Sequence, residues 1–171
     1  MAERKPAQEE EGQDTGALDE KGKALQSVVI EVFKDLSVEV GTSLDLVSVE
    51  VPREHIVAFC QKAKEEPRLD FKALLCLSVV DYEDRLQVVY HLLSLEHEHK
   101  MVVKVDTPSD EPRVASVTSV WRGADWYERE GAELFGVVFE GHPDPRPLLL
   151  WEGFEGYPLR KDYPFHDYQE W

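Results

Sequence analysis

The chain has 171 residues, of which 42% are apolar and 32% are charged. This balance is typical of one globular domain and excludes a collagen-like, coiled-coil or wholly disordered chain. There are 19 Lys and Arg residues against 35 Asp and Glu residues, so the formal net charge is −16. Such a surface repels phosphate backbones and anionic lipid headgroups, which argues against nucleic-acid binding and against direct adsorption to a membrane.

The two cysteines, Cys60 and Cys76, both lie in apolar stretches. Two thiols cannot supply the four ligands of an iron–sulfur cluster or of a structural zinc site. We therefore expect both to be buried, reduced thiols of a cytosolic protein. The longest apolar run, residues 73–80, is much shorter than the roughly 20 residues that cross a bilayer, so no membrane span is predicted.

Residues 1–22 are acidic and poor in apolar side chains, which predicts a disordered tail. Residues 23–36 follow the three-and-four spacing of an amphipathic helix, and residues 37–51 indicate two short strands around a glycine turn. Pro52 opens a second predicted helix, which ends before Pro67. The apolar stripe of that helix consists of Ile56, Phe59, Cys60 and Ala63.

Three strand-like runs follow, at residues 72–82, 85–95 and 100–107. Strands joined by short loops without an intervening helix pair in antiparallel fashion. The sequence therefore predicts a two-layer α+β fold, with helices packed on a mostly antiparallel sheet. A doubly wound nucleotide-binding fold is disfavoured because no glycine-rich turn links a strand to a helix.

Residues 116–136 predict a further helix, capped by Thr118 or Ser119 and ended by Gly136. A short strand and a turn follow it. Residues 151–171 are rich in Gly, Pro and aromatic side chains, which indicates an extended tail that packs on a partner. The α+β domain is accordingly placed at residues 23–150.

Glu128, Arg129 and Glu130 are the most conspicuous charged group of this helix. At about 100° per residue, the two glutamates fall on opposite edges of the apolar face, so they do not converge as a catalytic acid/base pair. Glu130 is expected to be half-buried and paired with a positive group, either of this chain or of a partner. Arg129 is expected to pair with Asp125 and Glu133, which lie four residues before and after it.

Three histidines are candidate site residues. His97 and His99 alternate in the loop between two strands, a spacing that could serve a metal ion, but a third clear ligand is missing and a solvated turn is preferred. His142 is a lone histidine at a turn. No serine or cysteine nucleophile and no phosphate-binding loop is recognisable. No catalytic, cofactor-binding or metal-binding residue is therefore assigned.

Arg160, Lys161 and Asp162 form a compact charged cluster between two Tyr-Pro pairs. The neighbouring prolines lower the entropy cost of docking this segment, and aromatic and arginine side chains are enriched in protein–protein hot spots. We therefore expect a partner-docking tail.

Residues 116–146 (SVTSVWRGADWYEREGAELFGVVFEGHPDPR) and 151–164 (WEGFEGYPLRKDYP) resemble the C-type subunit of respiratory complex I, which is the "30 kDa subunit" family of NADH–quinone oxidoreductase. The upstream run QVVYHLLSL is similar to the family as well. The chain departs from the usual family pattern at Gly131, Ala132, Glu133, Pro145 and Pro147.

The resemblance implies a cofactor-free subunit of the peripheral arm, with iron–sulfur clusters, flavin and quinone held by other subunits. It would pack against the D-type subunit, which contributes the quinone site, near cluster-bearing subunits and on the cytoplasmic face of the plasma membrane. The residues expected to contact partners are Glu128, Arg129, Glu130, His142, Pro143, Tyr157, Pro158, Leu159, Arg160, Lys161, Asp162 and Tyr163.

Two alternatives stay open. One is the equivalent subunit of a related complex, such as a membrane-bound hydrogenase or a ferredoxin- or deazaflavin-fed dehydrogenase. The other is a free-standing acid/base hydrolase that uses Glu128, Glu130 and His142.

Overall fold

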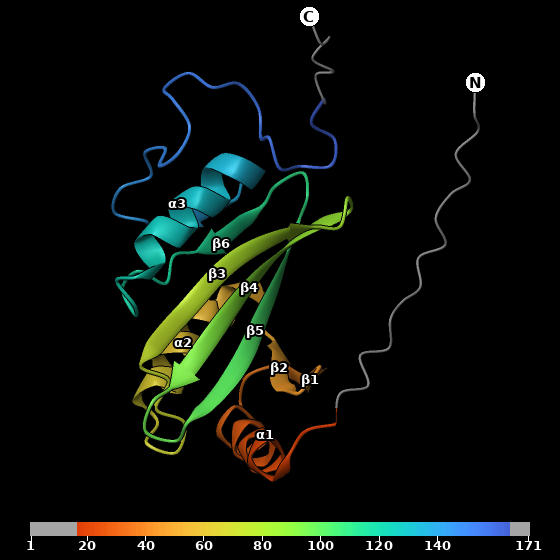
Figure 1. The fold of residues 1–171 in the computed structure, drawn as a ribbon, viewed down its shortest axis with the longest axis vertical. Helices are drawn as coiled ribbons and strands as arrows, with labels where there is room; N and C mark the ends of the chain where they lie inside the picture. The colour runs from red at the N-terminus through yellow and green to blue at the C-terminus, as the bar shows by residue number, and fades with distance from the viewer. Residues whose placement is uncertain (1–16, 165–171) are drawn as a thin grey trace, which may run out of the picture.

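The computed structural model describes residues 17–164, which form a two-layer α+β fold (Figure 1). The helices are α1 (Glu20–Val32), α2 (Ile56–Glu65), preceded by the short 3₁₀ helix η1 (Arg53–His55), and α3 (Ala124–Phe135). The strands are β1 (Glu39–Ser43), β2 (Leu46–Glu50), β3 (Ala73–Asp81), β4 (Arg85–Ser94), β5 (His99–Pro108), β6 (Arg113–Ala115) and β7 (Val138–Glu140). The predicted fold class is confirmed.

The main sheet has five strands in the order β1-β2-β5-β4-β3. Every neighbouring pair is antiparallel except β2 and β5, which are parallel. The connection between these two strands contains α2, β3 and β4. The inward face packs on α1 and α2 through a core that includes Phe33, Phe59 and Tyr90. The other face of β3, β4 and β5 is turned toward the viewer in Figure 1, and none of the described helices lies in front of it there.

Helix α1 begins earlier than the sequence indicated. Asp19 is its N-cap and accepts a hydrogen bond of 2.6 Å from the Gly22 N–H. Residues 20–22, predicted as part of the acidic tail, therefore form the first turn of the helix, and Leu18 before them is buried. A capping carboxylate near unpaired N–H groups stabilises a helix start, which explains the longer helix. Residues 1–16 of the predicted tail lie outside the described residues.

The turn between β1 and β2 differs from the prediction too. Gly41 lies inside β1, where it pairs with Ser48, and the chain reverses at Leu44 and Asp45 instead. Leu44 adopts a φ of 54° there. Both predicted strands form, but the turn between them lies three residues after the glycine that was predicted to mark it.

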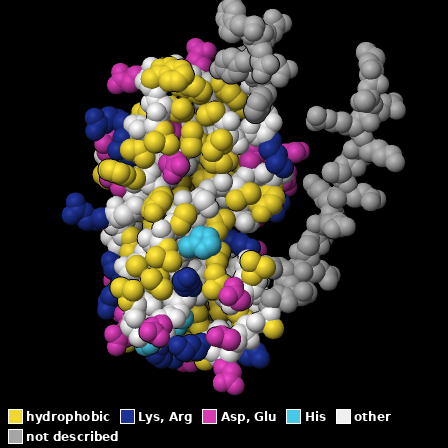
Figure 2. Space-filling view, viewed as in Figure 1, with side chains coloured by type: hydrophobic (Ala, Val, Ile, Leu, Met, Phe, Trp, Pro, Cys, Tyr) yellow, Lys and Arg dark blue, Asp and Glu magenta, His cyan; other side chains and the backbone are white. Residues whose placement is uncertain are grey.

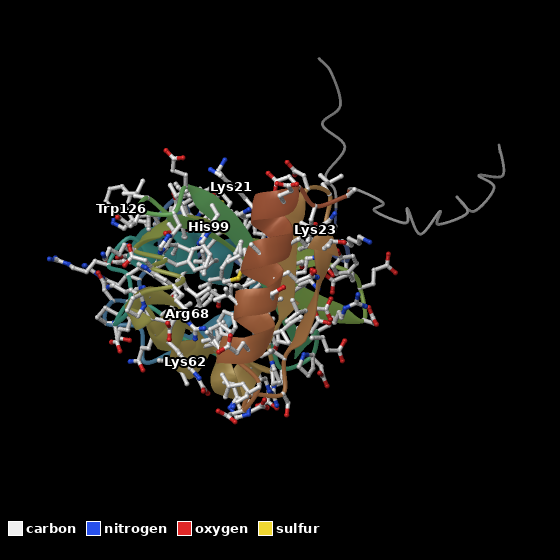
Figure 3. The ribbon with its side chains drawn as sticks, turned by 90° about the horizontal axis from the view of Figure 1, so that it is seen from below. Lys21, Lys23, Lys62, Arg68, His99 and Trp126 are labelled. Atoms are coloured by element: carbon white, nitrogen blue, oxygen red, sulfur yellow. The ribbon has the colours of Figure 1, made fainter. Side chains whose placement is uncertain are left out.

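Helix α2 has the predicted stripe: Ile56, Phe59, Cys60 and Ala63 are all buried. Its polar side supports α1, because Lys62 Nζ donates a hydrogen bond of 2.6 Å to the carbonyl oxygen of Val32. Arg68, in the loop after α2, reaches Glu31 at 3.1 Å. Figure 3 shows Lys62 and Arg68 beside the last turn of α1. Cations at this end interact favourably with the negative pole of the helix.

Strands β6 and β7 form a second, two-stranded parallel sheet. Only β7 was predicted, because the residues of β6 follow two prolines and the pattern is too short to stand out from a loop. Helix α3 packs on β3, and the contact is close at Gly131: a Cβ there would lie 3.0 Å from Val79 Cγ2. Within residues 17–164, no helix is long and apolar enough to cross a membrane.

Candidate functional site

Helix α3 positions most of the charged residues singled out above. It begins at Ala124, later than predicted, because residues 117–121 form a separate turn closed by the Trp121 N–H on the Val117 carbonyl oxygen. Trp121 Nε1 also donates to the carbonyl oxygen of Phe71 at 3.2 Å. The predicted end is confirmed: Gly136 follows Phe135 with a φ of 80°.

Glu128 lies on the inward face of α3, and its side chain is fully buried. Its Oε1 accepts a hydrogen bond of 2.7 Å from the Val117 N–H, while Oε2 is closed off from solvent and has no hydrogen-bond partner among the described residues. Burial raises the pKa of this carboxyl above its ordinary value. The carboxylate therefore holds the 117–121 turn against α3.

His142 lies next to Glu128, and only 3% of its side chain is exposed. Its Nδ1 accepts from the Asp144 N–H at 3.0 Å, so the proton belongs to Nε2, which donates to the Asp125 carbonyl oxygen at 3.2 Å. Nε2 is 3.9 Å from Glu128 Oε2. The histidine therefore ties the turn at residues 142–144 to the first turn of α3.

Glu130 is exposed, and none of the ion pairs among residues 17–164 includes it. The expected half-burial of Glu130 is therefore wrong, because Gly131, which follows, makes the close contact with the sheet. The pairing of Glu130 with a positive group of a partner stays a prediction. Since the side chains of Glu128 and His142 are enclosed and Glu130 points to solvent, the three groups required by the hydrolase alternative do not gather at one surface.

Arg129 and Glu133 hold the C-terminal segment, residues 142–164, against α3 (Figure 1, blue). Arg129 donates hydrogen bonds of 2.7 and 2.8 Å to the carbonyl oxygens of Arg146 and Pro147. One helical turn later, the Glu133 carboxylate accepts from the N–H groups of residues 148, 149 and 150 at 2.9, 2.8 and 3.1 Å. The predicted pairing of Arg129 with Asp125 and Glu133 is therefore replaced by backbone contacts.

The Arg-Lys-Asp cluster also turns back onto this chain. Arg160 donates to the carbonyl oxygen of Ser109 at 2.9 Å and to that of Phe135 at 3.4 Å, at the end of α3. The Lys161 N–H donates to Asp81 at 2.9 Å, and Lys161 Nζ lies 3.5 Å from Glu83. Asp162 is exposed and lies 3.6 Å from Arg160. The nearest acceptors of both cations are therefore groups of this chain, and their expected contact with a partner stays a prediction.

The two tyrosines of this segment pack on glycines. The Tyr157 ring lies over Gly136, so that a Cβ at Gly136 would come within 2.6 Å of Tyr157 Cε2. Tyr163 lies over Gly156 in the same way, at 2.8 Å. Pro143, which follows His142, is exposed. Residues 165–171 of the predicted docking tail lie outside the described residues.

A group of large apolar side chains on this segment nevertheless faces solvent. We define the docking surface as the exposed residues Leu149, Trp151, Tyr157 and Leu159. Leu149 and Trp151 expose 64% and 69% of their surface, although Glu133 fixes the backbone beside them. Figure 2 shows apolar side chains gathered at the upper end of this face, where the C-terminal segment lies. Patches of exposed apolar surface are typical of interaction sites. Leu149 was not predicted, because its run of leucines resembles an ordinary buried stretch.

The remaining candidates are structural. His97 and His99 stack with ring centroids 5.3 Å apart, and their Nε2 atoms contact the carbonyl oxygens of Pro67 and Leu69 at 2.8 and 3.2 Å. No group of three or more metal-ligating side chains occurs among residues 17–164. Cys60 is buried and Cys76 is half-buried, and both are free thiols.

The fold has counterparts among solved structures. A chain of the membrane-bound sulfane sulfur reductase, an archaeal respiratory membrane complex, superimposes with a TM-score of 0.71 at 28% identity and covers 85% of this chain and 86% of its own. A trypsin-resistant fragment of Nqo5 superimposes with a TM-score of 0.55 at 31% identity and covers 70% of this chain and 98% of its own.

Sequence comparison gives the family. Residues 49–169 match the family described as "Respiratory-chain NADH dehydrogenase, 30 Kd subunit", and the chain belongs to this family. It is 41% identical to the second C-type subunit of NADH-quinone oxidoreductase from Rhizobium etli, over 83% of this chain and 77% of the relative. It is 40% identical to the C-type subunit of a Methylobacterium strain, over 91% of this chain and 72% of the relative. The resemblance inferred from the sequence motifs is confirmed.

Proposed function

We propose that this chain is the C-type subunit of a proton-translocating NADH–quinone oxidoreductase and that it scaffolds the D-type subunit, called the quinone-site subunit below, during electron transfer from NADH to quinone. In this role it holds no cofactor of its own, and the iron–sulfur clusters, flavin and quinone belong to other subunits. It lies peripherally, on the cytoplasmic face of the plasma membrane, through its contacts within the complex. Cluster-bearing subunits are its further neighbours.

The docking surface carries this proposal. Four large apolar side chains are held out to solvent on a segment whose backbone is anchored by Arg129, Glu133 and Arg160. Anchoring lowers the entropy lost on association, and exposed aromatic side chains are frequent hot spots of interfaces. A surface prepared in this way favours stable docking of another protein over turnover of a small substrate.

Co-purification tests the proposal. The full chain is co-expressed with the quinone-site subunit of the same organism, and the affinity of the pair is measured for the wild type and for the double variant Leu149→Ala, Trp151→Ala. We expect at least a tenfold weaker association for the double variant, since each hot-spot side chain contributes more than about 1 kcal/mol. Leu95→Ala, an equally exposed leucine in the β4–β5 turn, serves as the control. Equal affinity of all three proteins would reject the docking surface.

A second candidate is the equivalent subunit of a related complex that takes electrons from another donor. The likeness to a chain of the sulfane sulfur reductase complex favours keeping it. The donor is bound by other subunits, so the intact complex decides. Oxidation of NADH by the complex that co-purifies with this chain supports the first candidate, and oxidation of a ferredoxin or a deazaflavin without NADH oxidation supports the second.

A further inference from the structure

A pocket of about 240 Å³ opens where the C-terminal segment crosses α3 and β7. Its apolar wall includes Ala132, Val138, Phe139, Pro145 and Tyr157. Val138 and Tyr157 are exposed, so apolar surface surrounds the pocket as well as lining it. Pockets that hold cofactors or small ligands usually measure about 300–1,000 Å³. This pocket is smaller, and its size suits one large side chain.

The polar groups of the pocket are either paired within this chain or closed off from solvent. The Arg129 guanidinium donates to the carbonyl oxygens of Arg146 and Pro147. His142 uses both ring nitrogens, and the unpartnered oxygen of Glu128 is closed off from solvent. Among the described residues, no accessible charge in the pocket therefore requires a polar group from outside, and an apolar occupant matches the wall.

The charge beside the docking surface is acidic. Glu152 and Glu155 are exposed, they flank the Trp151–Phe154 ring pair, and none of the ion pairs among residues 17–164 includes them. The cations of residues 142–164 are engaged: Arg146 with Asp144, Arg160 with Ser109, and Lys161 with Glu83. An approaching protein thus meets apolar side chains next to two uncompensated carboxylates.

We propose that this pocket is a socket for one large apolar side chain of the quinone-site subunit, and that this partner places basic side chains against Glu152 and Glu155. The inference rests on the proposed function and adds the chemistry of the partner: a protruding Phe, Leu or Met side chain with Lys or Arg nearby. Hot spots of the two sides of an interface pair in this manner, with an anchor filling a desolvated pocket. Complementary charge speeds and orients the encounter.

Substitutions that place a larger side chain of this protein in the pocket test whether an apolar side chain of the partner binds there. Val138→Phe, at the mouth of the pocket, is expected to weaken association with the co-expressed quinone-site subunit at least tenfold. Ala132→Leu fills the same pocket from α3 and provides a second variant. Ile30→Phe is the matched control, since Ile30 is exposed on α1, at the other end of the molecule (Figure 1). Circular dichroism and thermal melting establish that each variant is folded.

The salt dependence of association tests whether basic side chains of the partner lie against Glu152 and Glu155. Glu152→Gln combined with Glu155→Gln is expected to slow association and to flatten its dependence on salt concentration. The pair Glu39→Gln and Glu96→Gln removes the same charge from other exposed sites and is expected to change the salt dependence much less. Equal slopes for the two double variants would overturn the basic partner surface.

The outcomes separate this inference from the proposed function. If the wild type does not retain the quinone-site subunit, both fail. If Leu149→Ala with Trp151→Ala weakens binding while folded Val138→Phe and Ala132→Leu bind as the wild type does, only the socket fails. A chain that ends at Pro164 tests another occupant: if Val138→Phe no longer weakens binding once residues 165–171 are removed, the chain's own end fills the socket and the proposal is overturned.

Discussion

The contact between Gly136 and Tyr157 joins the end of α3 to the docking surface, and Gly136→Ala perturbs it directly. Gly136 has a φ of +80°, and an added Cβ would lie 2.6 Å from Tyr157 Cε2. Gly141 offers a matched control, because its φ is +81° and no atom lies within 4 Å of the corresponding Cβ. The two Gly→Ala substitutions therefore share the backbone strain and differ in the clash.

The magnitudes follow from these geometries. A left-handed backbone conformation costs a residue with a Cβ about 1–2 kcal/mol, so Gly141→Ala should lower the free energy of unfolding by about that amount. At Gly136 the Tyr157 ring must also withdraw by about 1 Å to restore an ordinary carbon–carbon contact. The ring is about half-buried, and losing about 100 Å² of apolar contact costs up to about 2.5 kcal/mol. Gly136→Ala should thus cost about 1–2.5 kcal/mol more than Gly141→Ala.

Urea denaturation of the two variants and of the wild type measures the difference. At this chain length, each kcal/mol corresponds to about 2–4 °C of melting temperature, so a thermal scan resolves it as well. The cycle is closed with Tyr157→Ala: in that background the extra cost of Gly136→Ala should disappear. Equal destabilisation by Gly136→Ala and Gly141→Ala would refute the packing of Tyr157 on the end of α3.

Three further predictions concern Glu133, Glu128 and the metal content of the purified chain. Glu133→Gln removes the charge that receives three backbone N–H groups, so hydrogen exchange at residues 148–150 should accelerate about tenfold or more, while exchange in β4 stays unchanged. Because burial raises the pKa of Glu128, this carboxyl contributes most to stability below about pH 4.5, and the contribution is lost as the pH rises through its folded-state pKa. Glu128→Gln should therefore gain stability relative to the wild type as the pH rises above about 4.5 in urea titrations, and parallel curves would contradict this. The purified chain should contain no iron and show no visible absorption, and stoichiometric iron by metal analysis would contradict the scaffold role.

Periodicity recovered the elements whose burial decides their conformation. The stripe of α2 was readable because one face of the helix meets the core, and β4 and β5 were readable as apolar runs joined by a short loop. Helix boundaries that depend on a single polar contact were harder to predict from the sequence. The Asp19 cap extended α1, and the turn closed by Trp121 on Val117 delayed α3, and neither contact leaves a periodic signal.

The sequence identified Arg129 and Glu133 as notable charged residues of the site, but it predicted the wrong partners for them. Helical spacing places Arg129 beside Asp125 and Glu133, yet the segment that crosses α3 supplies backbone carbonyl and N–H groups that bind both charges. Spacing describes one helix in isolation and carries no information on a stretch of chain that returns from residue 146 onward. For the same reason the sequence did not indicate that Ser109 and Glu83 lie beside Arg160 and Lys161, whose contact with a partner stays a prediction.

The parallel pairing of β2 with β5 has a consequence for synthesis of the chain. Val47 pairs with Met101, so the inner edge of β2 stays open until β3, β4 and β5 have all been made. Long-range parallel pairings form slowly, and unpaired strand edges attract other chains while they wait. The first hairpin, which emerges earliest from the ribosome, is therefore the segment most exposed to misassembly. It becomes part of the sheet only when the strand that completes the middle of the fold arrives.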